Sequence, residues 1–475
     1  MAAERSGGWS DWRSSPMALD AILAHKRAEL ASRKAALSHE ALLSRCVPTR
    51  RSLAAALRAG RPGFLLEIKF ASPSAGVIRP GGDLAPILES YGRHADAVSV
   101  LTDERFFGGS LERLAAVRGQ LEQPLLCKDF ILEPYQVAEA RAHGADAILL
   151  ILAAVDDAAW RACAAAAERL GMEVLTEVHD ASETSRAVAL GAALIGVNNR
   201  DLRTLRVDLA TTPALAPRIP ADRLVITESG IASRPDVAAL RPFADAFLVG
   251  SALMREGDLD AAVRRLIYGR TKVCGLTDPE HARAAWLAGA THGGVVFAAD
   301  SPRVVDRASA EAVRDGAPLE WVGVFADQDP AAIASLARDL ALTAVQLHGQ
   351  EAPETVARVR RLVPVECAVW KAVAVTERAP RREATGADRV VLDAKTPGGG
   401  RPFDWKLLAG YAELGESVLA GGLRAENAAS AAALGAYALD VSSGVESAPG
   451  RKDPNRLKAF FTARRRLPGR GDPTP

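Results

Sequence analysis

The sequence predicts an α/β protein built from two tandem (β/α)8 barrels of the TIM type, the first with an N-terminal helical extension. Short apolar runs bounded by turn or charged residues alternate with Ala-rich stretches of helical periodicity. These runs fall into two successive sets of eight, and eight strands alternating with helices in ~200 to 250 residues is the pattern of such a barrel. A length of 475 residues, with 48% hydrophobic and 25% charged residues, also favours two globular domains over one core.

The expected strands follow one another without a long gap. The first set covers 64–68, 97–101, 124–127, 147–152, 173–176, 194–197, 224–227 and 246–249. The second set covers 271–274, 294–297, 320–325, 343–347, 367–373, 389–392, 417–420 and 438–441. A doubly wound nucleotide-binding sheet would carry a G-x-G-x-x-G fingerprint after its first strand, and the segment IKFASPSAG at 68–76 lacks it.

The domain boundaries follow from composition. Residues 1–17 are polar, carry Glu4 and Asp11, and resemble neither a signal peptide nor a transit peptide, so we expect a disordered leader. One or two Ala- and Leu-rich helices over 18–45 then precede the first barrel. We expect the first domain at 18–268, the second at 270–465 and a disordered tail at 466–475, because Gly269 follows the helix 257–268 and leads into a new strand.

The charge and the cysteine content limit the kinds of partner that the chain can have. With 59 Lys and Arg against 58 Asp and Glu, the chain has no electrostatic footprint for nucleic acid or an acidic membrane surface. No apolar run approaches the ~20 residues of a membrane-spanning helix. Five cysteines without a C-x-x-C pair suit a reducing compartment. We therefore expect a cytoplasmic protein, a monomer, that binds small molecules.

In the first half, polar residues follow most of the strands. Reacting groups of TIM barrels sit at the carboxyl ends of strands, so these residues are candidates for a site. Lysines and carboxylates that share one barrel mouth push their pKa values apart, which lets one site hold a general acid and a general base. Glycines after strands seven and eight suit a bound phosphate, held by backbone N–H groups. The candidates are Glu67, Lys69, Ser72, Lys128, Glu177, Asn198, Arg200, Glu228, Ser229, Gly230, Gly250 and Ser251.

Residues ~20 to 255 resemble indole-3-glycerol-phosphate synthase. The motifs are EIKFASPS at 67–74, LCKDF at 126–130, TEV at 176–178, VNNRDL at 197–202, ESGI at 228–231 and LVGSALM at 248–254. That family converts a carboxyphenylamino-deoxyribulose phosphate to indoleglycerol phosphate by ring closure, with loss of CO2 and water.

The resemblance also implies roles. Lys128 is the general acid and Glu177 its acid/base partner, although the sequence leaves open whether Lys128, Lys69 or Glu177 moves a given proton. Glu67 and Asn198 act around the closing ring, with Glu228 and Ser229 in supporting contact. Phe107 and Phe130 flank the aromatic ring. The groups that hold carboxylate and phosphate oxygens are Lys69, Arg200, Gly230, Gly250 and Ser251.

The second half offers a cysteine and an aspartate. Cys274 ends the first strand of this set, Asp393 ends the sixth, and the glycines 398–400 predict a mobile loop over the site. A base and an acid on opposite sides of a barrel mouth suit an enolisation. Lys272 lies on the same strand face as Cys274, and we expect it to lower the pKa of the thiol. The expected phosphate-binding residues are Gly421, Gly422, Asp440, Ser442, Ser443 and Gly444.

Residues ~271 to 462 resemble phosphoribosylanthranilate isomerase. The motifs are KVCGLT at 272–277, SPR at 301–303, VQLHG at 345–349, LDAKTPGGG at 392–400, AGGL at 420–423 and DVSSGVE at 440–446. That family performs an Amadori rearrangement, and the resemblance makes Asp393 the general acid and Cys274 the base, with Arg303 on the anthranilate carboxylate. Its product is the substrate of the first family, so the two halves are expected to catalyse consecutive steps of tryptophan biosynthesis.

Neither reaction needs a cofactor, and we expect none. His348 and Glu351 have no third partner at metal-ligand spacing, so no metal site is expected either. Two alternatives remain: one barrel is a non-catalytic scaffold, or the pair are other phosphate-binding barrels, such as those of histidine biosynthesis. The complete set of acid and base positions argues against the scaffold, and the KDF and CGLT strings argue against the histidine enzymes.

Overall fold

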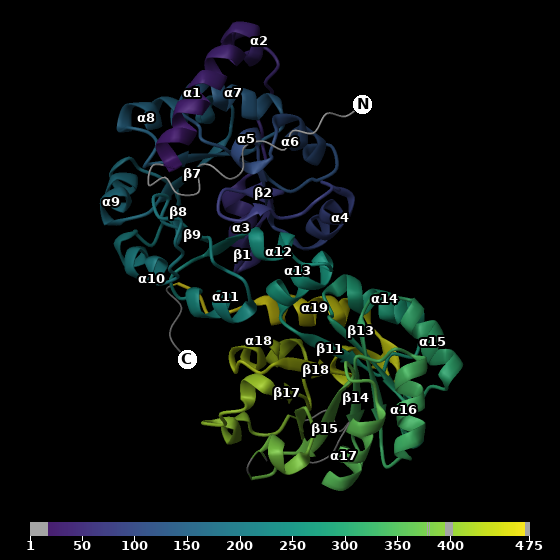
Figure 1. Cartoon of the computed structure of the whole chain (residues 1–475). Coiled ribbons are helices and arrows are strands. Elements are labelled where there is room, and N and C mark those ends of the chain that lie inside the picture. Colours follow the sequence, from purple (N-terminus) through teal and green to yellow (C-terminus); the bar gives the residue numbers. More distant parts are fainter. Residues whose placement is uncertain (1–17, 378, 380, 395–401, 471–475) are drawn as a thin grey trace. The chain divides into compact units, whose positions relative to one another are not determined.

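The computed structural model describes residues 18–377, 379, 381–394 and 402–470 and contains two closed barrels of parallel strands (Figure 1). The chain forms two compact units, which divide between Val263 and Arg264. This division lies inside helix α13 (Leu259–Tyr268), a few residues before the join expected at Gly269. The two-barrel prediction is confirmed.

The eight strands of the first barrel neighbour one another in the closed order β1-β10-β9-β8-β7-β6-β5-β4. Their residues are apolar on both faces, as expected for parallel strands that pack against side chains inside the barrel and helices outside it. Each overlaps an expected strand. They are β1 (Gly63–Ile68), β4 (Ala97–Leu101), β5 (Leu125–Lys128), β6 (Ala147–Ile151), β7 (Glu173–Val178), β8 (Leu194–Asn198), β9 (Leu224–Glu228) and β10 (Ala246–Val249).

Helices and one small hairpin surround this barrel. Many helices begin at a Ser or Asp whose side chain accepts a hydrogen bond from a first-turn backbone N–H, as Asp156 and Asp180 do. A hairpin that the sequence did not predict follows β1, formed by β2 (Ala71–Ser72) and β3 (Gly76–Val77). The helices are α1 (Ala18–Ala36), α2 (His39–Leu43), α3 (Leu53–Gly60), α4 (Ala85–His94), α5 (Glu104–Phe107), α6 (Leu111–Arg118), α7 (Pro134–Ala142), α8 (Asp157–Arg169), α9 (Ala181–Ala189), α10 (Thr211–Leu215), η1 (Ala216–Arg218), α11 (Arg234–Leu240) and α12 (Ser251–Met254).

Helix α1 is the expected extension, and it lies beside α7 and α8 (Figure 1). The hydroxyl of Tyr135 in α7 donates to the carbonyls of Arg33 and Leu37 at the end of α1. Ile22 and Leu23 are buried in the same apolar cluster as residues of the strands. The extension is therefore part of the packed first unit.

The second barrel closes in the order β11 to β18. Its strands are β11 (Thr271–Cys274), β12 (His292–Val296), β13 (Glu320–Phe325), β14 (Ala344–Leu347), β15 (Ala368–Ala374), β16 (Arg389–Asp393), β17 (Val418–Leu419) and β18 (Ala438–Val441). A hairpin of β19 (Glu446–Ala448) and β20 (Arg451–Lys452) follows β18. The helices are α14 (Pro279–Ala288), α15 (Arg307–Asp315), α16 (Pro330–Asp339), α17 (Pro353–Leu362), η2 (Arg382–Thr385), η3 (Trp405–Leu408), η4 (Leu414–Glu416), α18 (Ala425–Ala433), η5 (Ser443–Val445) and α19 (Pro454–Arg465).

The residues after α19 differ from the expected disordered tail at 466–475. Leu467 is buried, and residues 468–470 group with the first unit. Arg470 donates to the carbonyls of Pro220 and Arg223. Residues 471–475 and the expected leader 1–17 lie outside the described residues.

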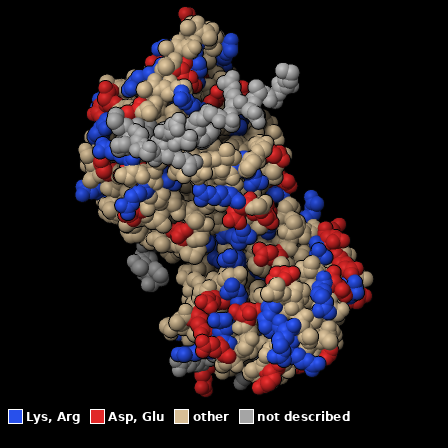
Figure 2. Space-filling view, viewed as in Figure 1, with Lys and Arg blue, Asp and Glu red and all other residues tan. Residues whose placement is uncertain are grey.

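Basic and acidic side chains alternate over the face of each unit that Figure 2 shows, in keeping with a net charge of +1. Within the described ranges, every helix is too short or too polar to cross a lipid bilayer.

Candidate active sites

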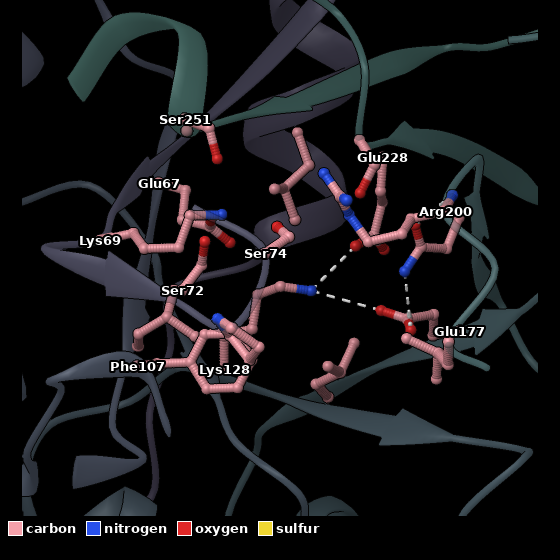
Figure 3. A pocket seen from close by; sticks show the side chains of 18 of the residues that line it. Glu67, Lys69, Ser72, Ser74, Phe107, Lys128, Glu177, Arg200, Glu228 and Ser251 are labelled. Atoms are coloured by element: carbon pink, nitrogen blue, oxygen red, sulfur yellow. Dashed lines mark hydrogen bonds and ion pairs between the residues drawn. The ribbon is translucent and has the colours of Figure 1, made fainter. Parts of the chain in front are cut away.

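The carboxyl ends of the strands of the first barrel surround a cavity of ≈ 290 Å³. Every residue that the sequence assigned to a site in this half borders it (Figure 3). The set comprises Glu67, Lys69, Ser72, Phe107, Lys128, Phe130, Glu177, Asn198, Arg200, Glu228, Ser229, Gly230, Gly250 and Ser251. Candidates from seven separate segments therefore meet at one place.

Lys128, at the end of β5, lies between two carboxylates. Its Nζ atom is 2.9 Å from Oε2 of Glu228 and 3.3 Å from Oε2 of Glu177 (Figure 3). The amide of Asn198 donates to the other oxygen of Glu177 over 3.0 Å. Both carboxylates are buried, with side chains 2% exposed. The arrangement holds one ammonium group where several strand ends converge.

Burial and charge act against each other in this group. Burial alone would lower the pKa of Lys128, but the carboxylates of Glu228 and Glu177 outweigh it and raise the pKa. Burial raises the pKa of Glu228 as well. For Glu177, burial is outweighed by Lys128 and by His179, so its pKa is lowered. Lys128 is thus a cation at neutral pH, and the two carboxylates beside it differ in their readiness to ionise.

A second ion pair lies at the end of β1, on another part of the cavity wall (Figure 3). Nζ of Lys69 lies 2.6 Å from Oε1 of Glu67. Gly250 lies close to this carboxylate, since a Cβ atom there would come within 2.5 Å of Oε1 of Glu67. The guanidinium of Arg200 donates to the carbonyl of Leu205 over 2.8 Å, and burial lowers its pKa. Lys69 and Arg200 thus place positive charge on the wall of the cavity, where it can bind an anionic ligand.

Aromatic and backbone groups complete the cavity. The rings of Phe107 and Phe130 lie with centroids 6.1 Å apart and planes inclined by 39°. Ser229 and Gly230 both have positive φ, 66° and 84°, which turns the chain sharply after β9. A side chain at Gly230 would meet Val207 at 2.5 Å, so glycine is required here.

Sequence reasoning missed several residues around this cavity. Leu19 and Ile22 of α1 border it, so the extension forms part of the wall. Lys26, one turn further along α1, is fully buried, and its Nζ lies 2.8 Å from Asp103 and 3.0 Å from Asp129. The helical spacing of 22 and 26 predicts a shared face. It does not reveal that the partner of this lysine is the aspartate of the KDF motif.

In the second barrel, Cys274 ends β11 beside a buried lysine. Nζ of Lys272 lies 2.8 Å from Oδ2 of Asp440 and 2.8 Å from Oε1 of Gln346. Burial raises the pKa of the Cys274 thiol, and the opposing effect of Lys272 is smaller. The expectation that this site lowers the thiol pKa is therefore wrong, because burial of the thiol outweighs Lys272 and Asp440 adds to the rise.

Asp393 ends β16 and has a histidine partner. Nε2 of His348 lies 3.4 Å from Oδ2 of Asp393, and the amide nitrogen of Gln346 lies 3.0 Å from Nδ1 of His348. Gln346 thus connects the surroundings of Cys274 with those of Asp393. The predicted loop at 398–400 lies outside the described residues.

Arg303 already has a carboxylate partner. Its guanidinium binds Glu446 through Nε and Nη2, over 2.9 and 2.6 Å. Lys452 binds the same carboxylate over 2.5 Å and also donates to the carbonyl of Cys274. Arg303 is thereby held in a fixed orientation close to the strand end that carries Cys274.

The expected phosphate-binding residues follow β17 and β18. Gly421 and Gly422 have φ of 82° and 63°, and the hydroxyl of Ser442 donates to the carbonyl of Cys274 over 3.1 Å. Ser443 begins η5, and a Cβ atom at Gly444 would overlap the carbonyl of Leu423. The side chain of Asp440 turns toward Lys272 rather than toward these loops.

The metal-ligand candidates have other partners. Glu351 binds Nζ of Lys371 over 3.0 Å, while His348 is the partner of Asp393. Within the described parts of the chain, His, Cys, Asp and Glu side chains form no group of three that could hold a metal ion.

Comparison with known proteins gives two family matches. Residues 19–266 match the family described as indole-3-glycerol phosphate synthase, and residues 271–463 match N-(5'-phosphoribosyl)anthranilate isomerase. A tryptophan biosynthesis protein TrpCF from Yersinia pestis is 50% identical over 410 residues, 86% of this chain and 86% of that protein. TrpCF from Vibrio parahaemolyticus serotype O3:K6 is 46% identical over 449 residues, 93% of each chain. A crystal structure of phosphoribosyl anthranilate isomerase from Thermus thermophilus is 37% identical, covering 41% of this chain and 97% of that chain with a TM-score of 0.38.

Both family matches fall on barrels whose strand ends carry the expected acid, base and glycine positions, and the relatives extend over both barrels. The chain therefore belongs to the TrpCF family of bifunctional tryptophan-biosynthesis enzymes, with an indole-3-glycerol phosphate synthase domain followed by a phosphoribosylanthranilate isomerase domain.

Proposed function

We propose that Lys128 is the general acid of the synthase reaction and that Glu177 is its acid/base partner. The observation that supports this assignment most strongly is the position of Lys128 Nζ between Glu177 and Glu228 in the cavity. An ammonium held there can donate a proton to the substrate carbonyl as the aromatic ring attacks it. Glu177 can then move protons as CO2 and water leave.

The remaining residues of the first barrel bind the substrate. Lys69 and Arg200 provide cations for its carboxylate and phosphate, and backbone N–H groups at Gly230, Gly250 and Ser251 add phosphate donors. Phe107 and Phe130 lie on the cavity wall, where their rings can contact the anthranilate ring. Glu67, Asn198, Glu228 and Ser229 orient the reacting part of the substrate.

For the isomerase reaction, we propose that Asp393 protonates the ribose ring oxygen and that Cys274 removes the proton from C2′. The two residues end different strands of one barrel and are connected through His348, Gln346 and Lys272. Arg303 then pairs with the anthranilate carboxylate. Gly421, Gly422, Ser442, Ser443 and Gly444 form the phosphate-binding side of this site, while Asp440 pairs with Lys272.

We also propose that the protein is a cytoplasmic monomer that acts on small phosphorylated anthranilate–ribose compounds and binds no nucleic acid. The residues that border the cavity of the first barrel all belong to that unit. All five cysteines are unpaired, which suits a reducing compartment. Light scattering during size exclusion would measure the oligomeric state, and a stable dimer would contradict this proposal.

Two variants of the full chain, assayed separately with each purified substrate, test the assignment. Lys128→Ala should reduce synthase turnover by ~10² to 10⁴-fold, the usual range for loss of a general acid, and leave the isomerase rate within about twofold. Asp393→Asn should produce the opposite pattern. A Lys128→Ala enzyme with normal synthase turnover would assign the acid role to another residue.

A further inference from the structure

Two chemically identical carboxylates contact the same lysine in the first barrel. Glu177 in β7 and Glu228 at the end of β9 lie on either side of β8, and each places its Oε2 atom against Nζ of Lys128. Both side chains are 2% exposed. Like charges that share a buried site disfavour each other's ionised form, so something must decide which of the two carries the charge.

The remaining oxygen of each carboxylate has different surroundings. Oε1 of Glu177 lies 3.0 Å from the amide nitrogen of Asn198 and 3.1 Å from Nε2 of His179. Oε1 of Glu228 is buried without a hydrogen-bond partner in the described part of the chain. Glu177 therefore has one hydrogen-bond donor, Asn198, and one ionisable neighbour, His179, that Glu228 lacks.

His179 follows β7 directly and is held from its other side by Glu183, in the first turn of α9. Oε2 of Glu183 lies 3.0 Å from Nδ1 of His179 and also accepts the backbone N–H of His179 over 2.8 Å. Burial disfavours the charged imidazolium, but Glu177 and Glu183 outweigh this effect and raise the pKa of His179 to about 10. The imidazole ring is therefore a cation with both nitrogens facing carboxylates.

We propose that His179 is a positioning residue that makes Glu177, and not Glu228, the ionised and fixed carboxylate beside Lys128. The inference rests on the proposed role of Glu177 in the synthase reaction. His179 is not among the residues that border the cavity, so it acts through Glu177 and not on the substrate. Glu228, without such a partner, remains the carboxylate that can carry a proton.

The other groups near the two carboxylates bring no positive charge to Glu177 alone. Lys128 contacts both carboxylates, and Glu67, paired with Lys69, is an anion that raises the pKa of Lys128 and of Glu228. Asn198 is neutral, so its hydrogen bond favours a carboxylate without adding positive charge. The imidazolium of His179 is thus the cation that contacts one carboxylate of the pair and not the other.

The test is the pH dependence of synthase turnover in the full chain carrying His179→Gln. Loss of the imidazolium raises the pKa of Glu177, so the acid limb of the kcat profile should move to higher pH by ~1 unit or more, the usual effect of one neighbouring charge. The KM should stay within about twofold, because His179 does not border the cavity. His179→Lys, which keeps a positive charge, should move the limb back toward its wild-type position.

The same chain supplies the controls. Isomerase turnover in the second barrel should be unchanged in both variants. His143→Gln makes the same substitution at a histidine whose Nδ1 faces the carbonyl of Glu139 in α7, outside the cavity, and should leave the synthase profile unchanged.

Two results would overturn the inference about His179. One is an unshifted acid limb in His179→Gln; the other is an equal loss of turnover at every pH that His179→Lys does not recover, which would indicate a structural role only. Separately, Glu177→Gln should abolish synthase turnover. If Glu177→Gln retained activity, the proposed role of Glu177 itself would fail, and the inference with it.

Discussion

The Nζ atom of Lys272 lies 2.8 Å from Oδ2 of Asp440, although 168 residues separate the two in the chain. The lysine that neighbours Cys274 therefore has a carboxylate partner of its own. Burial, and Asp440 in addition, keep the pKa of the Cys274 thiol above its ordinary value despite Lys272 and Lys452. Without bound substrate, the proposed base is therefore mostly a neutral thiol at pH 7.

Cys274→Ser tests this proposed base. A serine hydroxyl is nearly the size of the thiol but far less acidic, so isomerase kcat should fall by ~10² or more with little change in KM, as expected for loss of a general base. Because the thiolate is the active form and the pKa is raised, kcat/KM of the wild type should increase as the pH rises from 7 to 9. Steady-state assays with freshly made phosphoribosylanthranilate would measure both. A variant with wild-type rates would make Cys274 a packing residue, while synthase turnover serves as the control.

The strands could be predicted because buried parallel strands are short, almost continuous apolar runs. The candidates of the first cavity could be predicted for a related reason: once the strand ends are known, the barrel brings their polar residues together. Partners that come from elsewhere in the chain could not be predicted. No local pattern joins Lys272 to Asp440, or Lys26 of the extension to Asp129. The shift of the Cys274 pKa depends on such partners and on burial. The sequence reveals neither, so the predicted direction of this shift was wrong.

Arg303→Ala tests the carboxylate-binding role of Arg303. Loss of charge-assisted hydrogen bonds, worth about 1.5 to 3 kcal/mol, should raise the KM for phosphoribosylanthranilate by ~10 to 100-fold. The kcat should change little, since Arg303 is not assigned to proton transfer. Glu446 keeps Lys452 as a partner at 2.5 Å, so the substitution does not leave this buried carboxylate unpaired. Initial rates at varied substrate concentration measure both constants, and an unchanged KM would exclude Arg303 from substrate binding.

Lys26→Met tests how the N-terminal extension is held to the first barrel. The side chain of Lys26 is fully buried between Asp103 and Asp129, whose carboxylates would lose their cation. Removing one partner of a buried ion pair costs about 3 to 5 kcal/mol, and we expect the free energy of unfolding of the first barrel to fall by that order. The pKa of Lys26 is raised in the folded protein. Its contribution to the free energy of unfolding is therefore fully present below ~10.4, the pKa of a lysine in the unfolded chain, and is lost only as the pH rises further.

Urea unfolding followed by synthase activity, between pH 6 and 9, measures this effect. The loss of stability should be the same throughout that range, and isomerase activity should be retained to the wild-type urea concentration. Lys34→Met is the matched control, because Lys34 lies on the same helix, is 48% exposed and pairs with Glu133 at the surface. Equal stability of Lys26→Met and Lys34→Met would mean that the buried lysine does not hold α1 in place.

The boundary between the two compact units lies inside helix α13. The sequence places the start of the second domain at residue 270, whereas the second compact unit begins at Arg264. Arg264 is 1% exposed and donates to the carbonyl of Ala290, and the ring of Tyr268 packs edge-on against Phe461 with centroids 5.7 Å apart.

A fragment that begins at 270 lacks both residues and exposes apolar surface on α19. We therefore expect the free energy of unfolding of fragment 264–467 to exceed that of 270–467 by about 2 kcal/mol, because the shorter fragment loses both the partly buried ring of Tyr268 and the buried Arg264. Thermal and urea unfolding of the two purified fragments would measure the difference, and isomerase assays would show whether each keeps its reaction. If the two fragments were equally stable, the second domain would begin after Gly269, and the second barrel would not need the end of α13.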